Sequence, residues 1–500
     1  MSVEFEKLTA GKLNPGAIVP QGLDNQWAPT NALRRMIKQA KPLISWKGRK
    51  KAVLSEWRRA LIYAPQVVVN RVALFNNSIV VDDYSGNDKK NFQELLRRKV
   101  IVDYLLTEES PDQRPTFEIG DEKWNRWMDV IQDTKLACVR LDWGKQEDDF
   151  KNIAAVFHSY VQNLNMPDRT EHLTNAFRIP KRHREAFRKK LIEVASYTFD
   201  IASQGKNVVR NELYKKFVCV DNSKIDDGYY DKNKPFAAEL KEIFDLRYTV
   251  NVPDAFGRYA FTPKGSPDRT VLGDVNQATM QNLLRDNRVK DFIDSLKRMQ
   301  FAILNDALYL KGLDILSLAD VLTIRNTDEW EQYTQSLNSL LRHPMEFAEK
   351  IDDVATRFNK LNRKITDMKI ANTKKSAGEL VSRLQPNMMI VVAIGGALMQ
   401  LMLDPTDASR ILVQTLSGPV SIGLAPIAIN LRISASEYVD LGISVNFMRS
   451  KVNNGREIWR EVQGALKDDP HFKFLEEQDL GIARDADQSK KEIDWNEVLG

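Results

Sequence analysis

The chain has 500 residues and a formal net charge of +5; 43% of its residues are hydrophobic and 28% are charged. These values are ordinary for a globular chain long enough for several domains, and they exclude an intrinsically disordered protein. Only two cysteines are present, Cys138 and Cys219, which excludes a disulfide framework and favours a reducing, cytoplasmic setting. The first residues lack the apolar run of a secretory signal.

The sequence pattern of the N-terminal third predicts an irregular arm followed by a small unit of helices and strands. Residues 1–30 are rich in Pro, Gly and Asn without hydrophobic period, which predicts an irregular arm. Residues 31–147 begin with a basic segment and continue into the β-branched runs APQVVVNRVALF, NSIVVDDY and RKVIVDYLLT, which we predict to be strands. KNFQELLRR, between the last two runs, has helical spacing. We therefore expect a small α/β unit.

From about residue 148 the helical period dominates. Residues 148–273 predict a helical domain with two long polar loops, 274–473 a helical body, and 474–500 an acidic tail. The predicted fold class is mainly α with a small mixed α/β N-terminal unit and a multi-layer helical body that carries a C-terminal hydrophobic helical hairpin.

A heptad stripe follows Pro344, which suits the first turn of a helix. Its apolar residues alternate in steps of four and three over 347–368. They are Phe347, Ile351, Val354, Phe358, Leu361, Ile365 and Met368. The stripe predicts either a coiled-coil seam, with a second copy as partner, or a helix packed lengthwise in its own core.

Two uncharged stretches occupy much of 384–431 and are separated by the short loop DPTDASR. Each is about twenty residues long, the length a helix needs to cross a bilayer. Their polar residues, together with Pro419 and Pro426, favour a buried core hairpin instead. Both interpretations involve the same apolar residues: Val391, Ile394, Leu398, Leu412, Ile422 and Ile427.

The segment from Arg34 to Arg59 contains ten basic residues and one acid, Glu56. Basic and aromatic side chains together are typical of nucleic-acid surfaces. The candidate RNA- or DNA-binding residues are Arg34, Arg35, Lys47, Arg49, Lys50 and Lys51, with Trp46 and Trp57. The alternative is a basic helix pair whose tryptophans belong to the core.

Arg178 and His183 are separated by four residues, a spacing that resembles the R-x4-H signature of HEPN ribonucleases. The resemblance covers these six residues, with Pro180 between the two. It implies metal-independent RNA cleavage in which His183 moves a proton and Arg178 binds the phosphate. The alternative is the basic start of a surface helix.

Carboxylates that follow predicted strands are a further candidate: Asp82, Asp83, Asp103 and Asp221. Acids at strand ends can hold Mg²⁺, but they are also common turn formers. No spacing fixes a ligand set, so we predict no metal site. The standard phosphate-binding loops and catalytic motifs are absent from the sequence, and no cofactor is predicted.

The resulting functional hypothesis is a non-enzymatic interaction or effector protein. It would self-associate through its C-terminal helical region and contact membrane lipid through 384–431. The alternatives are an RNA- or DNA-binding protein and a HEPN-like ribonuclease.

Overall fold

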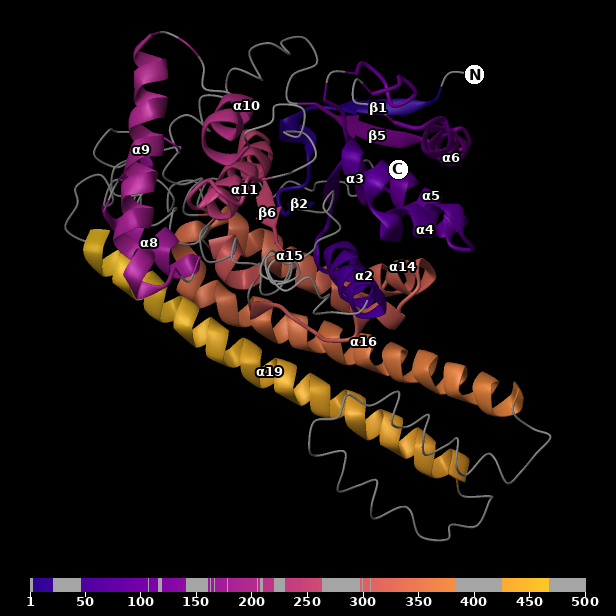
Figure 1. Ribbon diagram of the computed structural model, residues 1–500. Helices are drawn as coiled ribbons and strands as arrows, with labels where there is room; N and C mark the ends of the chain where they lie inside the picture. The colour runs from indigo at the N-terminus through magenta and orange to yellow at the C-terminus, as the bar shows by residue number, and fades with distance from the viewer. Residues whose placement is uncertain are drawn as a thin grey trace, which may run out of the picture.

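The computed structural model describes residues 3–20, 46–140, 161–262, 297–383 and 425–466, with gaps at 107, 116–118, 162, 166, 178, 205, 207–209, 220–229, 299 and 306. Helices predominate in these ranges and accompany a six-stranded sheet (Figure 1). The predicted mainly α class with an α/β portion is confirmed at this level. Residues 384–424 and the acidic tail lie outside the described ranges.

The sheet is parallel throughout, in the order β1-β5-β4-β3-β2-β6. Its strands are β1 (Phe5–Leu8), β2 (Ile18–Pro20), β3 (Val67–Asn70), β4 (Ile101–Tyr104), β5 (Leu136–Val139) and β6 (Tyr259–Phe261). The predicted irregular arm is therefore wrong for β1 and β2. Both strands are too short to show an alternating pattern, and they depend on pairing with distant strands.

The central strands are buried on both faces, as parallel strands usually are. Along β3, Val67 and Val69 join the larger core while Val68 joins the smaller core on the other face. Ile101 and Val102 of β4 divide in the same way. The alternation puts Asp103 on the face of the larger core, at the carboxyl end of its strand.

Helices cover the larger-core face of the sheet. They are α2 (Trp46–Tyr63), α3 (Arg71–Asn76), α4 (Ser78–Ser85), α5 (Lys89–Arg97) and α6 (Asp121–Ile131). The opposite face packs against Leu13 and Ala17 of the β1–β2 connection. It also packs against Phe256, just after α11 (Ala237–Ala255). The sheet thus takes strands from outside the predicted 31–147 unit.

Helix α4 replaces the strand predicted for NSIVVDDY. The Asn77 side chain accepts hydrogen bonds from the backbone N–H groups of Ile79 at 2.9 Å and Val80 at 3.3 Å. This N-cap satisfies donors that would otherwise be left open in the first turn. Local capping and burial of Ile79 and Val80 outweigh the β propensity of the Ile-Val-Val run.

The region 161–255 has a core of its own. Its elements before α11 are η2 (Asn163–Asn165), α8 (Pro167–Ala176), η3 (Lys181–His183), α9 (Arg184–Ser203), α10 (Arg210–Leu213) and a π-helical turn, η4 (Tyr214–Val218). Phe187, Leu191, Tyr214 and Phe244 lie at the centre of this cluster, which is distinct from the two cores of the sheet.

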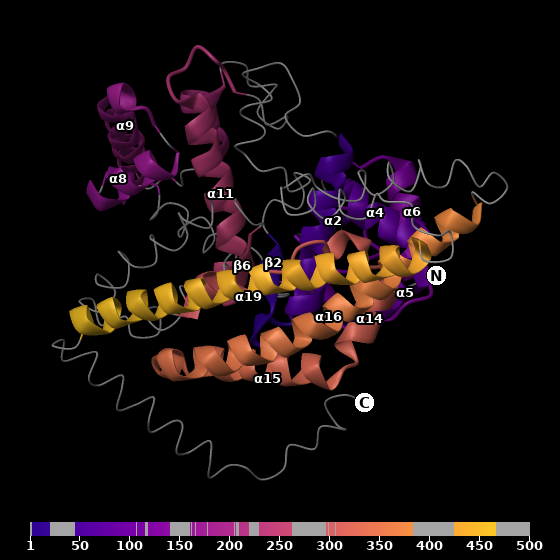
Figure 2. The same ribbon diagram turned by 90° about the horizontal axis from the view of Figure 1, so that it is seen from below.

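The C-terminal region is built on two long helices. Its elements are η6 (Leu313–Ile315), α14 (Leu318–Arg325), α15 (Asp328–Arg342), η7 (Pro344–Glu346), α16 (Phe347–Arg383) and α19 (Ala425–Leu466). Helices α16 and α19 lie side by side along much of their length (Figures 1 and 2). Figure 1 shows the end of α16 and the start of α19 extending past α14, away from the sheet.

The heptad stripe lies inside the chain's own core. From Phe347 to Ile365 its residues are fully buried, and Met368 packs against the same core. Helices α15 and α19 pack along α16. The stripe is therefore the seam of a helix packed lengthwise, and it is not available to a second copy in this conformation.

Candidate functional site

Four charged side chains meet at the carboxyl ends of the central strands. Asp103 is near the end of β4, while Arg71 and Arg140 directly follow β3 and β5. Glu108 lies in the loop after β4. Asp103 and Arg71 are 0% exposed, Glu108 is 1% exposed and Arg140 is 3% exposed. Such burial is rare for ionisable groups unless they are paired.

Arg71 lies between the two acids. Its Nε is 3.6 Å from Asp103 Oδ2, and its Nη1 is 3.3 Å from Glu108 Oε1. Its Nη2 donates to the carbonyls of Pro111 at 2.9 Å and Gln113 at 3.1 Å. Arg71 therefore fastens the loop after β4 to the sheet.

Arg140 holds the same loop from the β5 side. Its Nη1 donates to the Glu108 carbonyl at 3.2 Å and to Glu109 Oε1 at 2.8 Å. Glu108 Oε2 in turn accepts from the Leu106 backbone N–H at 2.9 Å. We refer to residues 108–113 as the covering loop, because the two arginines hold it over the carboxyl ends of β4 and β5.

The electrostatics of this cluster favour a protonated Asp103. Burial raises the pKa of Asp103 to about 7; Arg71 opposes this rise and Glu108 adds to it. A carboxyl group that titrates near neutral pH can serve as a general acid or base. Burial, together with the charge of Asp103, raises the pKa of the neighbouring Cys138 thiol, which therefore stays protonated and unreactive.

Several hydrogen bonds at the cluster are not made within the described residues. Both carboxylate oxygens of Asp103 lack a hydrogen-bond donor, and Nε and Nη1 of Arg71 lack an acceptor. Buried polar atoms in folded proteins nearly always have a partner. Asp103 therefore faces Arg71 Nε, and Glu108 faces Arg71 Nη1, with hydrogen-bonding capacity left over on Asp103 and Arg71.

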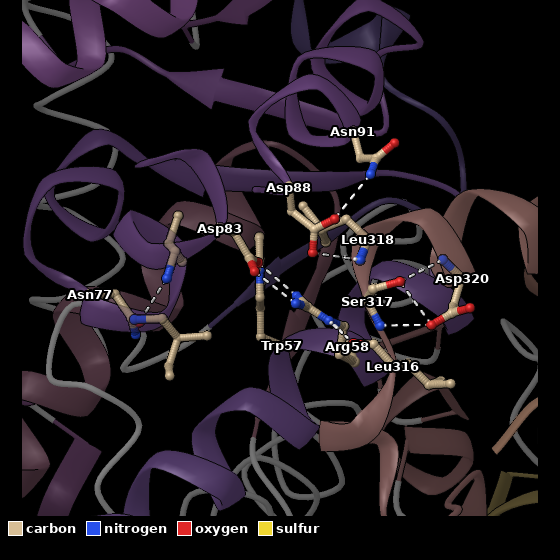
Figure 3. Close-up of polar contacts among 12 residues, drawn as sticks. Trp57, Arg58, Asn77, Asp83, Asp88, Asn91, Leu316, Ser317, Leu318 and Asp320 are labelled. Atoms are coloured by element: carbon tan, nitrogen blue, oxygen red, sulfur yellow. Dashed lines mark hydrogen bonds and ion pairs between the residues drawn. The ribbon is translucent and has the colours of Figure 1, made fainter. Parts of the chain in front are cut away.

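A second buried arginine, Arg58, is fully satisfied (Figure 3). Its Nη1 and Nη2 donate to the two oxygens of Asp83 at 2.6 and 2.7 Å, and its Nε donates to the Leu316 carbonyl at 2.8 Å. The Trp57 indole N–H also donates to Asp83, at 2.9 Å. This network joins α2 and α4 to the segment before α14, where Ser317 and Asp320 form a capping box.

The residues predicted to bind nucleic acid differ in where they lie: some are exposed on α2, Trp57 is buried, and others lie outside the described residues. Helix α2 begins at Trp46 and carries Lys47, Arg49, Lys50 and Lys51. Lys50 and Lys51 are exposed, and Lys50 pairs with Asp82 at 2.6 Å. Trp57 is fully buried, so the described conformation does not present its ring to a base. Arg34 and Arg35 lie outside the described residues.

The two residues of the R-x4-H spacing cannot be placed together. Arg178 lies outside the described residues. His183 is exposed at the end of η3, where Arg182 Nε donates to its Nε2 at 3.0 Å. Ribonuclease activity stays a prediction.

The carboxylates singled out in the sequence do not gather. Asp82 and Asp83 lie on α4 rather than at a strand end, and both oxygens of Asp83 are taken by Arg58 and Trp57. Asp221 lies outside the described residues. No group of three or more His, Cys, Asp or Glu within the described ranges is arranged to hold a metal ion.

The predicted hairpin is described only at its end. Ile427 belongs to α19. Val391, Ile394, Leu398, Leu412 and Ile422 lie outside the described residues. Among the helices that are described, none combines the length and the apolar character needed to cross a bilayer.

Comparison with protein-family models, curated proteins and solved structures finds no match to this chain. The candidate site therefore rests on its own geometry. Of its residues, sequence reasoning singled out Asp103 and missed Arg71, Glu108 and Arg140. A usable signal was present, because Arg71 and Arg140 each follow a buried apolar strand directly.

Proposed function

We propose that the protein is an interaction or effector protein whose helices α16 and α19 form an arm that carries a membrane-contacting segment. The supporting observation is the geometry of the arm. Helix α16 ends at Arg383 and α19 begins at Ala425, and both of these helix ends lie at the end of the pair that is remote from the sheet. In the sequence from 384 to 424, charges occur only within DPTDASR.

The arm is held together by polar contacts between its helices. Buried Lys369 of α16 pairs with Glu437 of α19 at 2.6 Å, and the Tyr438 hydroxyl donates to Asp367 at 2.6 Å. Arg456 pairs with Asp352 further along. These pairings run in opposite directions along the two helices, which are therefore antiparallel. A stiff antiparallel pair of this kind would hold an apolar segment at a fixed distance from the sheet.

Self-association would use the outer face of α19 rather than the buried heptad stripe. Tyr438 is 50%, Val439 59% and Ile443 53% exposed. Val439 and Ile443 are one turn apart and share a helix face. Exposed apolar side chains gathered in this way are typical of contact surfaces, and we propose a second copy of the chain as the partner.

Vesicle flotation tests the membrane contact. The full chain should float with vesicles of phosphatidylcholine and anionic phosphatidylglycerol, because Lys374, Lys375 and Arg383 precede the uncharged segment. Leu398→Asp should abolish flotation and leave thermal unfolding unchanged. Asn453→Asp, at an exposed position of α19, is the matched control and should float. Failure of the full chain to float, together with unfolding of Leu398→Asp, would show that the segment is core.

Sedimentation in the presence of the same lipids tests self-association. Val439→Glu combined with Ile443→Glu should leave the chain monomeric while flotation persists. If the double variant still associates, the outer face of α19 is not the contact surface.

A further inference from the structure

The strand order defines a topological switch point between β4 and β5. The chain leaving β4 leads into α6, whose Trp127 and Ile131 pack on the larger-core face. The connection from β5 to β6 reaches the sheet through α11 and Phe256, and Phe256 contacts Tyr104 on the opposite face with ring centroids 5.0 Å apart. In open parallel α/β sheets, ligands bind at the carboxyl ends of two neighbouring strands whose connections leave to opposite faces.

The cluster of Asp103, Arg71, Glu108 and Arg140 lies at this switch point. The register pairs Asp103 of β4 with Cys138 of β5 and with Val69 of β3. The topology and the unmet hydrogen bonds of Asp103 and Arg71 are independent observations, and they indicate the same place. Together they indicate a ligand site beneath the covering loop.

The charges narrow the chemistry of the ligand. A phosphate or carboxylate would meet the buried carboxylate of Glu108 and, in its ionised form, that of Asp103, and a cation would meet Arg71 and Arg140. Either charge would be opposed at short range in a poorly solvated site. A neutral group avoids both repulsions.

The unused hydrogen-bonding groups of Asp103 and Arg71 further restrict the chemical class of the ligand. Asp103 offers two acceptor oxygens, and Arg71 offers one donor nitrogen, Nε, on the side that faces it, while its Nη1 faces Glu108. A hydroxyl both donates and accepts, so two adjacent hydroxyls can donate to the two oxygens of Asp103 while one of them accepts from Arg71 Nε. We propose that the carboxyl ends of β4 and β5 bind the vicinal hydroxyl pair of a sugar, with Asp103 accepting from both hydroxyls and Arg71 donating to one of them.

The covering loop is the entrance to this site. Arg71 and Arg140 fasten it through the Pro111, Gln113 and Glu108 carbonyls and the exposed Glu109 carboxylate. A ligand that accepts from Arg71 binds under this loop. This inference is independent of the proposed role of the arm.

Titration calorimetry on the full chain tests the proposal, with adenosine and 2′,3′-dideoxyadenosine as probes that differ only in the two hydroxyls. Adenosine should bind about tenfold or more tightly than the dideoxy compound, the size expected for losing hydrogen bonds to charged groups. D-ribose and D-glucose serve as probes without a base, and binding of either supports the site. Equal binding of the two nucleosides, or no binding of any of the four probes, would overturn it.

The Asp103→Asn variant tests whether the probe binds at the switch point between β4 and β5. It should weaken binding of whichever probe binds by about tenfold or more. Asp129→Asn, the same exchange at a side chain that is 71% exposed, should leave binding unchanged. Unchanged affinity in a folded Asp103→Asn chain would also overturn the proposal. The nucleoside comparison uses the unaltered chain, so it decides the question even if Asp103→Asn does not fold.

Discussion

Arg58 and Arg71 are both buried beside a carboxylate on the same side of the sheet, yet the two clusters are built differently. Arg58 places both terminal nitrogens on Asp83 at hydrogen-bond distance, and Trp57 completes the shell. Arg71 approaches Asp103 and Glu108 only to 3.6 and 3.3 Å, with hydrogen-bonding capacity left over. A satisfied pair fixes helices in place, whereas the incompletely satisfied pair at the carboxyl ends of β3 and β4 is the one for which we propose a ligand.

The strongest test of this contrast removes one carboxylate at a time. Asp83→Asn leaves the Arg58 charge buried without an anion and should lower the free energy of unfolding by about 3–5 kcal/mol. Chemical denaturation measures the effect. Asp103→Asn should cost far less at neutral pH, because Arg71 keeps Glu108 and Asp103 is already partly protonated. Similar losses in the two variants would remove the distinction between the clusters.

The next test isolates a single hydrogen bond in the Arg58 cluster. Trp57→Phe removes the indole donor to Asp83, while Trp127→Phe removes an equally buried indole whose N–H makes no hydrogen bond within the described residues. Both exchanges lose similar volume. The first should therefore cost about 1.5–3 kcal/mol more than the second, the range for a hydrogen bond to a charged group. Equal changes in melting behaviour would mean that the bond to Asp83 adds nothing.

The pH dependence of stability sharpens the comparison at Asp103. Burial raises the pKa of Asp103 from its ordinary value of 3.8 to about 7, so between these values the folded chain holds a proton that the unfolded chain releases. Stability should then fall as the pH rises through this window. In Asp103→Asn this part of the pH profile should disappear, as measured by denaturation from pH 4 to 8. A profile that keeps its slope would assign the titration to another group.

The smallest effect is expected at the surface of the Arg58 cluster. Lys50 and Asp82 form a 2.6 Å pair with side chains that are 46% and 58% exposed. Lys50→Ala should change the free energy of unfolding by about 1 kcal/mol or less, since solvent screens exposed pairs. A loss comparable to that of Asp83→Asn would mean that α2 depends on this surface contact as much as on the buried one.

Much of the helical architecture could be read from local pattern. The 4-3 spacing from Phe347 to Met368 predicted a long amphipathic helix, and α16 follows it from its first residue. The β-branched runs around Val67–Asn70 and Ile101–Tyr104 likewise predicted strands that exist. NSIVVDDY forms a helix despite its β propensity, because Asn77 caps the helix and because burial of Ile79 and Val80 stabilises it.

By itself, the sequence determined the helical periods, the two apolar strands β3 and β4 and the uncharged stretches of 384–431, because these depend on residues close together in the chain. Only the tertiary structure decided which parts of the fold these segments pack against. It places Phe5–Leu8 and Tyr259–Phe261 at opposite edges of one sheet, covers the heptad stripe with α15 and α19, and buries Trp57. It also brought Arg71, Asp103 and Arg140 together, since only parallel strand pairing places the carboxyl ends of three separate strands side by side.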